Sequence, residues 1–338
     1  MSNWYLQNGK ESDVVISSRV RLARNIKNYN FPSNLTKEEE KEILDKIKDI
    51  TLGLGYGLKF INLKDIDDIT KISLIEKHLI SPDFAISKKE NKGILINDDE
   101  NICIMINEED HLRLQVFSSG LDIENLMNLA IEIDEKLSGF VNYAFNDKYG
   151  FLTSCPTNIG TGAKCSVMVH LPALTITGNI SKILDVVSNF GMNIRGVYGE
   201  GTESQGNIYQ IFNNQSLGIT EKEIVKSIKA ITEKVIEQER LARNYLSKNS
   251  LELENKIYRS FGILSYSKFL SSEECRKLLS DVKLGTDLGI IKELTDFKVN
   301  KMLLYTKTGN LQKYFGKQLL GQERDIKRAE VIKNILKE

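Results

Sequence analysis

The stretch Gly150–Leu174, which reads GFLTSCPTNIGTGAKCSVMVHLPAL, decides how the chain around it folds. Its two ends, Phe151–Ser154 and Cys165–Leu171, carry the alternating or clustered apolar residues that are typical of β-strands. A proline and two glycines interrupt the segment between them, so the pattern predicts a loop there. We therefore expect Cys155 to lie at the end of a strand.

The predicted loop is suited to an oxyanion such as a phosphate. Its small residues leave backbone N–H groups uncrowded, and Lys164 adds a positive charge nearby. The alternative is a plain hairpin with Cys155 buried inside it, because small turn residues serve both purposes.

Composition limits the classes of protein to consider. The chain has 338 residues, 41% hydrophobic and 27% charged, which allows one large domain or two ordinary ones. Lysine plus arginine equal aspartate plus glutamate at 46 each, so we expect neither a nucleic acid nor a membrane as partner. Met1–Lys10 does not resemble a signal peptide, and no apolar run approaches the ~20 residues that span a bilayer, so we expect a cytoplasmic protein. The four cysteines form no CxxC pair and have no histidine at ligand spacing, which argues against structural zinc and disulfides.

Over most of the chain, patterns typical of helices alternate with patterns typical of strands. Toward the C-terminus only helical patterns remain. Capping boxes at Thr36–Glu39 and Thr220–Glu223 predict helix starts, and Asp122–Leu137 is amphipathic. Strands are predicted at Phe60–Leu63, Ile94–Asn97, Ile102–Ile106 and Ile208–Phe212, and late helices at Leu251–Phe261, Ser271–Val282 and Gln322–Leu336. We predict an α+β fold with a larger domain, residues 1–247, followed by a smaller helical domain, residues 248–338.

Basic residues follow the first apolar run. If Val14–Ile16 continues as a strand, Arg19 and Arg21 share one face, where two guanidiniums form an anion clamp. The alternative is an exposed edge strand.

Acidic residues gather at two further positions. Asn107–Arg113 places three adjacent carboxylates after a strand, and alternation would put Glu109, His111 and Arg113 on one side if the extended chain continues. Arg195 and Glu200 bracket a glycine-rich loop.

Together these candidates match phosphoryl transfer, which depends on positioning and on neutralising charge. Arginines and Lys164 would hold an anion, while GTGAKCS lacks the spacing of a P-loop and no protein-kinase motif is present. Glu109 and Glu200 indicate a cationic acceptor, because a guanidinium attacks poorly until carboxylates orient it and remove a proton.

Six motifs carry a resemblance to a known family: SSRVRLARN (Ser17–Asn25), EKHLISP (Glu76–Pro82), NEEDHLR (Asn107–Arg113), LTSCPTNIGTG (Leu152–Gly162), RGVYGEGTE (Arg195–Glu203) and RDIKRA (Arg324–Ala329). In this order they resemble the phosphagen (guanidino) kinase family, and within it the bacterial branch that phosphorylates arginine in proteins. The resemblance covers nearly the whole chain.

The resemblance implies a fold, a reaction and a set of site residues. The fold is an antiparallel sheet flanked by helices, followed by a helical dimerisation domain. The catalytic set is Glu109 as the base, Glu200, Cys155 and Asp110. The implied ATP-binding set is Ser17, Ser18, Arg19, Val20, Arg21, His78, Arg113, Lys164, Cys165, Ser166, Val167, Met168, Arg195, Gly196, Val197, Tyr198 and Gly199. Mg²⁺ would arrive with ATP, without a metal site of its own, and Arg324, Asp325 and Arg328 would bind phosphoarginine as an allosteric signal.

The resemblance also implies partners. They are protein substrates with exposed arginines, a zinc-binding activator protein, a Clp chaperone-protease and a second copy of the chain. Because the matching core begins at Val14, the resemblance leads us to expect no counterpart of the small domain with which animal creatine and arginine kinases enclose a free guanidino compound. The rival hypotheses are a kinase of free arginine or another small guanidino compound, and a catalytically weak adaptor that binds phosphoarginine. The departure is Lys164-Cys165 where the family has Arg-Ala, since lysine keeps the charge but loses the guanidinium fork.

Overall fold

The computed structural model of the protein describes residues 3–197 and 204–338. In these residues the strands are β1 Val15–Arg24, β2 Lys59–Asn62, β3 Gly93–Ile96, β4 Ile102–Ile106, β5 Leu112–Ser119, β6 Phe145–Asn146, β7 Gly150–Phe151, β8 Ala163–His170, β9 Met192–Gly196 and β10 Ile208–Asn213. Eight of them form one antiparallel sheet in the order β2-β3-β4-β5-β1-β8-β10-β9, while β6 and β7 pair separately. The centre of the large sheet is therefore β1 between β5 and β8.

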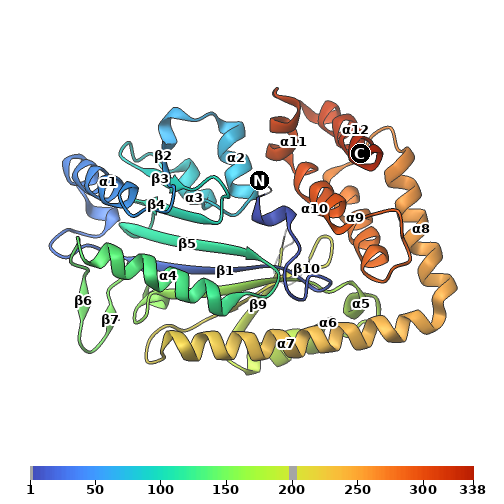
Figure 1. The fold of residues 1–338 in the computed structure, drawn as a ribbon, viewed down its shortest axis with the longest axis horizontal. Coiled ribbons are helices and arrows are strands. Elements are labelled where there is room, and N and C mark those ends of the chain that lie inside the picture. The colour runs from blue at the N-terminus through green and yellow to red at the C-terminus, as the bar shows by residue number, and fades with distance from the viewer. Residues whose placement is uncertain (1–2, 198–203) are drawn as a thin grey trace.

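The described helices fall into two groups along the chain. Those that accompany the sheet are α1 Lys37–Leu52, α2 Asp68–Glu76, α3 Pro82–Ile86, α4 Ile123–Ser138, α5 Pro172–Ile176, α6 Ile180–Asn189 and α7 Glu221–Leu246. Those that follow are α8 Ser250–Tyr266, α9 Ser272–Asp287, α10 Asp296–Tyr305, α11 Thr308–Phe315 and α12 Gly321–Lys337. Figure 1 shows α4 and the long α7 along one side of the sheet and the second group at one end of the molecule.

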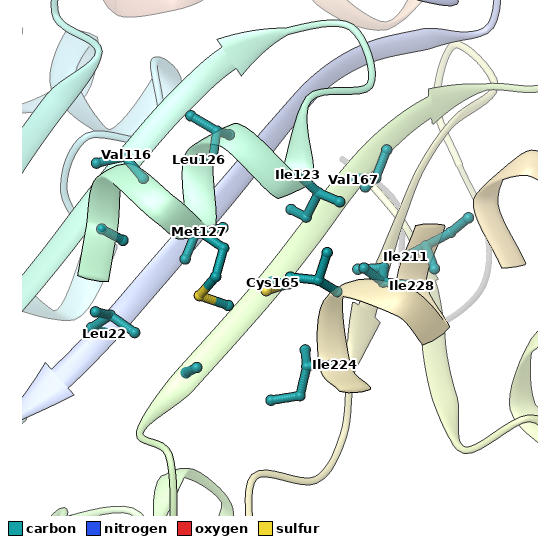
Figure 2. Close-up of a cluster of buried hydrophobic side chains, with 14 of the residues drawn as sticks. Leu22, Val116, Ile123, Leu126, Met127, Cys165, Val167, Ile211, Ile224 and Ile228 are labelled. Carbon is teal, nitrogen blue, oxygen red and sulfur yellow. The ribbon is translucent and has the colours of Figure 1, made fainter. Parts of the chain in front are cut away.

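One face of the sheet is packed against α4 and α7. Alternate residues of the strands point into this core, as the period of two requires, and Val20, Cys165 and Val167 are fully buried there. Figure 2 shows Cys165 and Val167 among side chains of α4 and α7, with Met127 and Ile224 nearby. This face of the sheet is the main hydrophobic core.

The opposite face is covered in part. Over β3, β4 and β5, side chains such as Ile94 and Met105 pack with Leu74 of α2 and Phe84 of α3 in a second cluster. Because both faces of β4 are buried, its sequence ICIMI is continuously apolar instead of alternating. Over β1, β8 and β10 this face carries polar side chains.

The C-terminal helices have a hydrophobic cluster of their own, which includes Ile257, Leu279 and Ile332. Leu246, the last residue of α7, packs against both this cluster and the main core. None of the described helices has the combination of length and apolar character that crossing a bilayer requires.

The predicted fold class is confirmed: an antiparallel sheet is flanked by helices and followed by a helical part. The hairpin alternative for Gly150–Leu174 is wrong, because β7 pairs with β6 whereas β8 pairs with β1 and β10. The strand predicted at Phe151–Ser154 is only two residues long. A backbone bridge between Phe151 and Gly160 closes the loop, where a Cβ on Gly160 would lie 2.2 Å from the Ser216 carbonyl oxygen.

The predicted alternation of Glu109, His111 and Arg113 is also wrong. The chain turns at Asn107, whose φ is +60°, and β5 begins only at Leu112. His111 is buried, with Nδ1 accepting from the Ile26 N–H at 2.9 Å and Nε2 2.8 Å from the Asn30 carbonyl oxygen. These two contacts with the backbone hold the His111 imidazole in the turn.

Candidate active site

Four arginines from three strands line one cavity on the polar face of the sheet. Arg19 and Arg21 come from β1, Arg113 from β5 and Arg195 from β9, and the cavity has a volume of about 670 Å³. Arg19 and Arg21 share this face because they are two residues apart in a strand. The predicted anion clamp is therefore part of a larger cationic cavity.

These guanidiniums have few negative partners. Arg19 Nε donates to Ser166 Oγ at 3.3 Å, and Arg195 Nη2 donates to Gln210 Oε1 at 3.0 Å. Arg21 Nε is buried and has no hydrogen-bond partner among the described residues. Burial, followed by the charges of Arg113 and Arg195, lowers the pKa of Arg19 to about 9, and burial beside Arg19 also lowers the pKa of Arg21. Such a cluster favours a polyanionic ligand that supplies the missing negative charge.

His78 lines the same cavity in an unusual backbone conformation. Its φ is +62°, and its Nε2 is buried with no hydrogen-bond partner in the described part of the chain. Burial, followed by the charge of Lys307, lowers the pKa of His78 well below its ordinary value. The lowered pKa favours the neutral imidazole, whose buried Nε2 lies at the cavity without a hydrogen bond to any described residue.

Glu108 is a functional candidate that the sequence reasoning missed. Both of its carboxylate oxygens accept from Arg113 Nη1 at 2.6 Å, and it also accepts from Ser81 Oγ at 2.6 Å and from the Glu109 N–H at 2.9 Å. Burial would raise the pKa of Glu108, but Arg113 and these hydrogen bonds outweigh it and hold the pKa below its ordinary value. The sequence feature that could have identified Glu108 is its position between an apolar strand and Arg113.

Glu109 and Asp110 lie beside Glu108 but differ from it in exposure. Glu109 is exposed, and its pKa is raised, first by partial desolvation and then by Asp110 and Glu108 against the opposing charge of Arg113. Asp110 is buried, and its Oδ1 accepts from Asn25 Nδ2 and from the Ser154 N–H, both at 2.7 Å. Asp110 therefore ties the turn at 107–111 to the Cys155 loop.

Cys155 precedes a short 3-10 turn, Pro156–Asn158, and is half-buried. Its Sγ lies 3.1 Å from Thr157 Oγ1, and its carbonyl oxygen accepts from Thr153 Oγ1 at 2.9 Å. Burial, followed by the charge of Arg21, lowers the pKa of Lys164, while Cys155 opposes that effect. The thiol and the lysine are thus close enough to interact.

The strands bring only some of the predicted ATP-binding side chains to this face. Ser17, Ser166, Met168, Gly196 and Val197 lie at the cavities or on the face that lines them. Ser18, Val20, Cys165 and Val167 are buried on the opposite face, so they can contribute only backbone groups. Tyr198, Gly199 and Glu200 lie outside the described residues.

The predicted phosphoarginine residues lie apart from the arginine cavity, on α12. Arg328 is 2% exposed and donates to the carbonyl oxygens of Thr306 at 2.9 Å and Leu270 at 2.7 Å, and to Asp325 at 2.5 Å. Arg324 is half-buried on the same helix. The buried Arg328 thus holds α12 to the turn after α10.

Comparison with known families defines the class of enzyme. Residues 38–242 match the ATP:guanido phosphotransferase C-terminal catalytic domain, and residues 250–338 match the protein-arginine kinase McsB C-terminal domain. The duplicated taurocyamine kinase of Schistosoma mansoni, solved with transition state analogue components, is similar at 31% identity and a TM-score of 0.62, over 69% of this chain and 34% of that one. Lombricine kinase is similar at 25% identity and a TM-score of 0.60, over 69% and 68%. The fold is therefore that of an ATP-using phosphotransferase of the guanidino kinase class.

Relatives that match over nearly their whole length identify the family within this class of enzymes. The protein-arginine kinase of Halothermothrix orenii is 47% identical over 99% of this chain and 97% of its own length. That of Bacillus subtilis is 43% identical over 99% and 93%. The chain belongs to the protein-arginine kinase family.

Proposed function

We propose that the protein transfers the γ-phosphoryl group of ATP to arginine side chains of proteins. The observation that carries this proposal is the cavity lined by four arginines, two of which, Arg113 and Arg21, interact electrostatically with the exposed Glu109. Arg19, Arg21, Arg113 and Arg195 would neutralise the phosphates, and Mg²⁺ would enter with the nucleotide. Arg21 Nε and His78 Nε2, which have no hydrogen-bond partner within residues 3–197 and 204–338, support a nucleotide as the ligand.

The residues at the acceptor side fit the chemistry of a guanidinium. A nitrogen lone pair of the acceptor forms the new bond to the γ-phosphorus, the bond to the β-phosphate oxygen breaks, and ADP leaves. The proton lost by the acceptor goes to Glu109, whose raised pKa suits a base. Cys155 would lie near the same guanidinium, and Glu200 would be its second carboxylate partner. Asp110 would position the Cys155 loop instead of reacting.

Biological context follows from the resemblance and from the family. The relatives' name, protein-arginine kinase, supports protein substrates over free arginine. We propose a cytoplasmic homodimer that marks proteins for Clp-type proteolysis, with a zinc-binding activator protein and phosphoarginine binding at Arg324, Asp325 and Arg328. The division into residues 1–247 and 248–338 is also a proposal, supported by the separate hydrophobic clusters.

Incubation with ATP and an arginine-rich unfolded protein tests the proposal. We expect acid-labile phosphate on arginine, and a signal no higher than that of Glu109→Gln would refute it. Faster turnover of free arginine than of the protein substrate would favour the small-molecule kinase. The adaptor hypothesis predicts instead that Arg324→Ala and Arg328→Ala abolish function whereas Glu109→Gln does not.

A further inference from the structure

The last residue of α2 and the start of α11 are joined by four hydrogen bonds. The Glu76 carboxylate accepts from the Gly309 N–H at 2.8 Å, the Asn310 N–H at 2.9 Å and Asn310 Nδ2 at 2.8 Å. In return, Lys307 Nζ donates to the Glu76 carbonyl oxygen at 3.0 Å. A side chain of the EKHLISP motif thus caps a helix of the C-terminal part.

The two helices also approach each other closely beside these bonds. Ser73 Oγ donates to Asn310 Oδ1 at 2.8 Å, and both residues are buried. A Cβ on Gly309 would lie 2.6 Å from the Ser73 backbone nitrogen, so only glycine permits this separation. On the far side, Arg328 holds the carbonyl of Thr306, the residue before Lys307. The start of α11 therefore has little freedom to move relative to α2.

His78 follows Glu76 by two residues, and both residues line the same two cavities. One is the arginine cavity, and the other, of about 120 Å³, also has Leu304, Thr306 and Lys307 in its walls. The left-handed backbone of His78 carries a conformational cost, and such a residue persists only where its surroundings fix it. The Glu76 bonds fix the chain before His78, and the Leu79 N–H, which donates to the Leu74 carbonyl at 2.9 Å, fixes it after.

We propose that Glu76 is a positioning residue through which the C-terminal helical part holds His78 in the nucleotide cavity. Nucleotide affinity then depends on contact between α11 and α2, although no residue of α11 lines the arginine cavity. This inference rests on the proposed function, because it takes ATP as the ligand of that cavity.

Titration calorimetry with ATP and Mg²⁺ on the full chain tests the role of Glu76. Glu76→Gln turns an amide NH₂ toward the Asn310 donors, and we expect it to weaken ATP binding about tenfold. Gly309→Ala, which changes no polar group but forces α11 away from α2, should have a similar effect. The matched control is Thr295→Ala, which removes the N-cap of α10 without touching α2 and should lower the melting temperature but leave ATP affinity unchanged.

A double-mutant cycle separates positioning from general destabilisation. If Glu76 acts through His78, Glu76→Gln should cause no further loss of affinity in a His78→Ala background. Wild-type affinity in Glu76→Gln, an equal loss in Thr295→Ala, or additive losses in the cycle would each overturn the inference. If Glu76→Gln does not fold, Asn310→Ala removes two of the side-chain bonds and should weaken binding in the same direction. Failure of the wild-type protein to bind ATP would instead refute the proposed function itself.

Discussion

Three consecutive carboxylates, Glu108, Glu109 and Asp110, have different surroundings. The Glu108 carboxylate accepts hydrogen bonds from Arg113 and Ser81. The Asp110 carboxylate accepts hydrogen bonds from Asn25 Nδ2 and the Ser154 N–H. Glu109 alone of the three is exposed, and its pKa is raised. The role that we propose for each carboxylate rests on its hydrogen-bond partners and its exposure, which cannot be read from the sequence motif.

Separate substitutions of Glu109 and Glu108 should have different kinetic effects, the first mainly on kcat and the second mainly on the KM for ATP. We expect Glu109→Gln to lower kcat at least about 100-fold, because the proposed general base is lost, with the KM for ATP nearly unchanged. Glu108→Gln should instead raise the KM for ATP about tenfold, since Arg113 loses the carboxylate that fixes its Nη1. Steady-state kinetics with a protein substrate measure both, and the reverse pattern would contradict these roles.

His111 should make the folded state sensitive to acid. Its Nδ1 accepts from a backbone N–H, so the folded imidazole is neutral, and burial lowers its pKa to about 4. The unfolded chain binds a proton near pH 6.5, so stability is unaffected above that pH and falls by up to about 3 kcal/mol as pH decreases toward 4. His78 and His170, whose pKa values are also lowered, act in the same direction.

Urea unfolding between pH 7 and pH 4.5 measures this loss. His111→Gln removes the titrating group and should show a shallower pH dependence than the wild-type protein. Equal slopes would mean that His111 does not contribute.

Among the secondary-structure elements, features that depend on residue periodicity could be predicted from the sequence. Features that depend on tertiary contacts could not. Alternation in β1 correctly placed Arg19 and Arg21 on one face, and the capping boxes at Thr36 and Thr220 form as predicted. The short helices α2, α3, α5, α10 and α11 were not predicted, because segments of this length contain too few turns for a helical period to be recognised. The contact between Glu76 and α11 joins residues more than 230 positions apart, so no local pattern could reveal it.

Neighbouring residues of β8 should respond oppositely to alanine because they face opposite sides of the sheet. Lys164 lies with its Nζ 5.0 Å from the Phe212 ring centroid on the cationic face, so Lys164→Ala should raise the KM for ATP about tenfold with little change in stability. Cys165 is fully buried in the core, so Cys165→Ala should cost about 1 kcal/mol of stability and leave the KM unchanged. Kinetics and thermal unfolding on both variants provide the comparison, and a KM effect in Cys165→Ala would show that the face assignment is incomplete.

At the scale of the whole molecule, buried charges join the sheet region to the C-terminal helices. Arg243 of α7 donates from Nε to Glu239 at 2.9 Å and from Nη1 to Asp287 of α9 at 3.5 Å, and from Nη2 to the Asp13 carbonyl oxygen at 2.9 Å. Lys283 also pairs with Asp287, whose pKa burial raises to about 6. One guanidinium therefore connects the N-terminal segment, α7 and α9.

The contribution of the buried Arg243 network to stability can be compared with that of the exposed ion pairs of Arg240, which lies on the same helix, α7. Arg243 is 4% exposed at its side chain, whereas Arg240, which pairs with Glu11 and Asp13, is 45% exposed. Arg243→Met leaves Glu239 without its counter-charge and Asp287 with only Lys283, so we expect a loss of about 3 kcal/mol in the free energy of unfolding. Arg240→Met removes two solvent-screened ion pairs, with Glu11 and with Asp13, and should cost less than about 1 kcal/mol. Urea unfolding at pH 7 measures both variants, and equal losses would mean that the buried network does not join the two parts of the molecule more strongly than the surface pairs do.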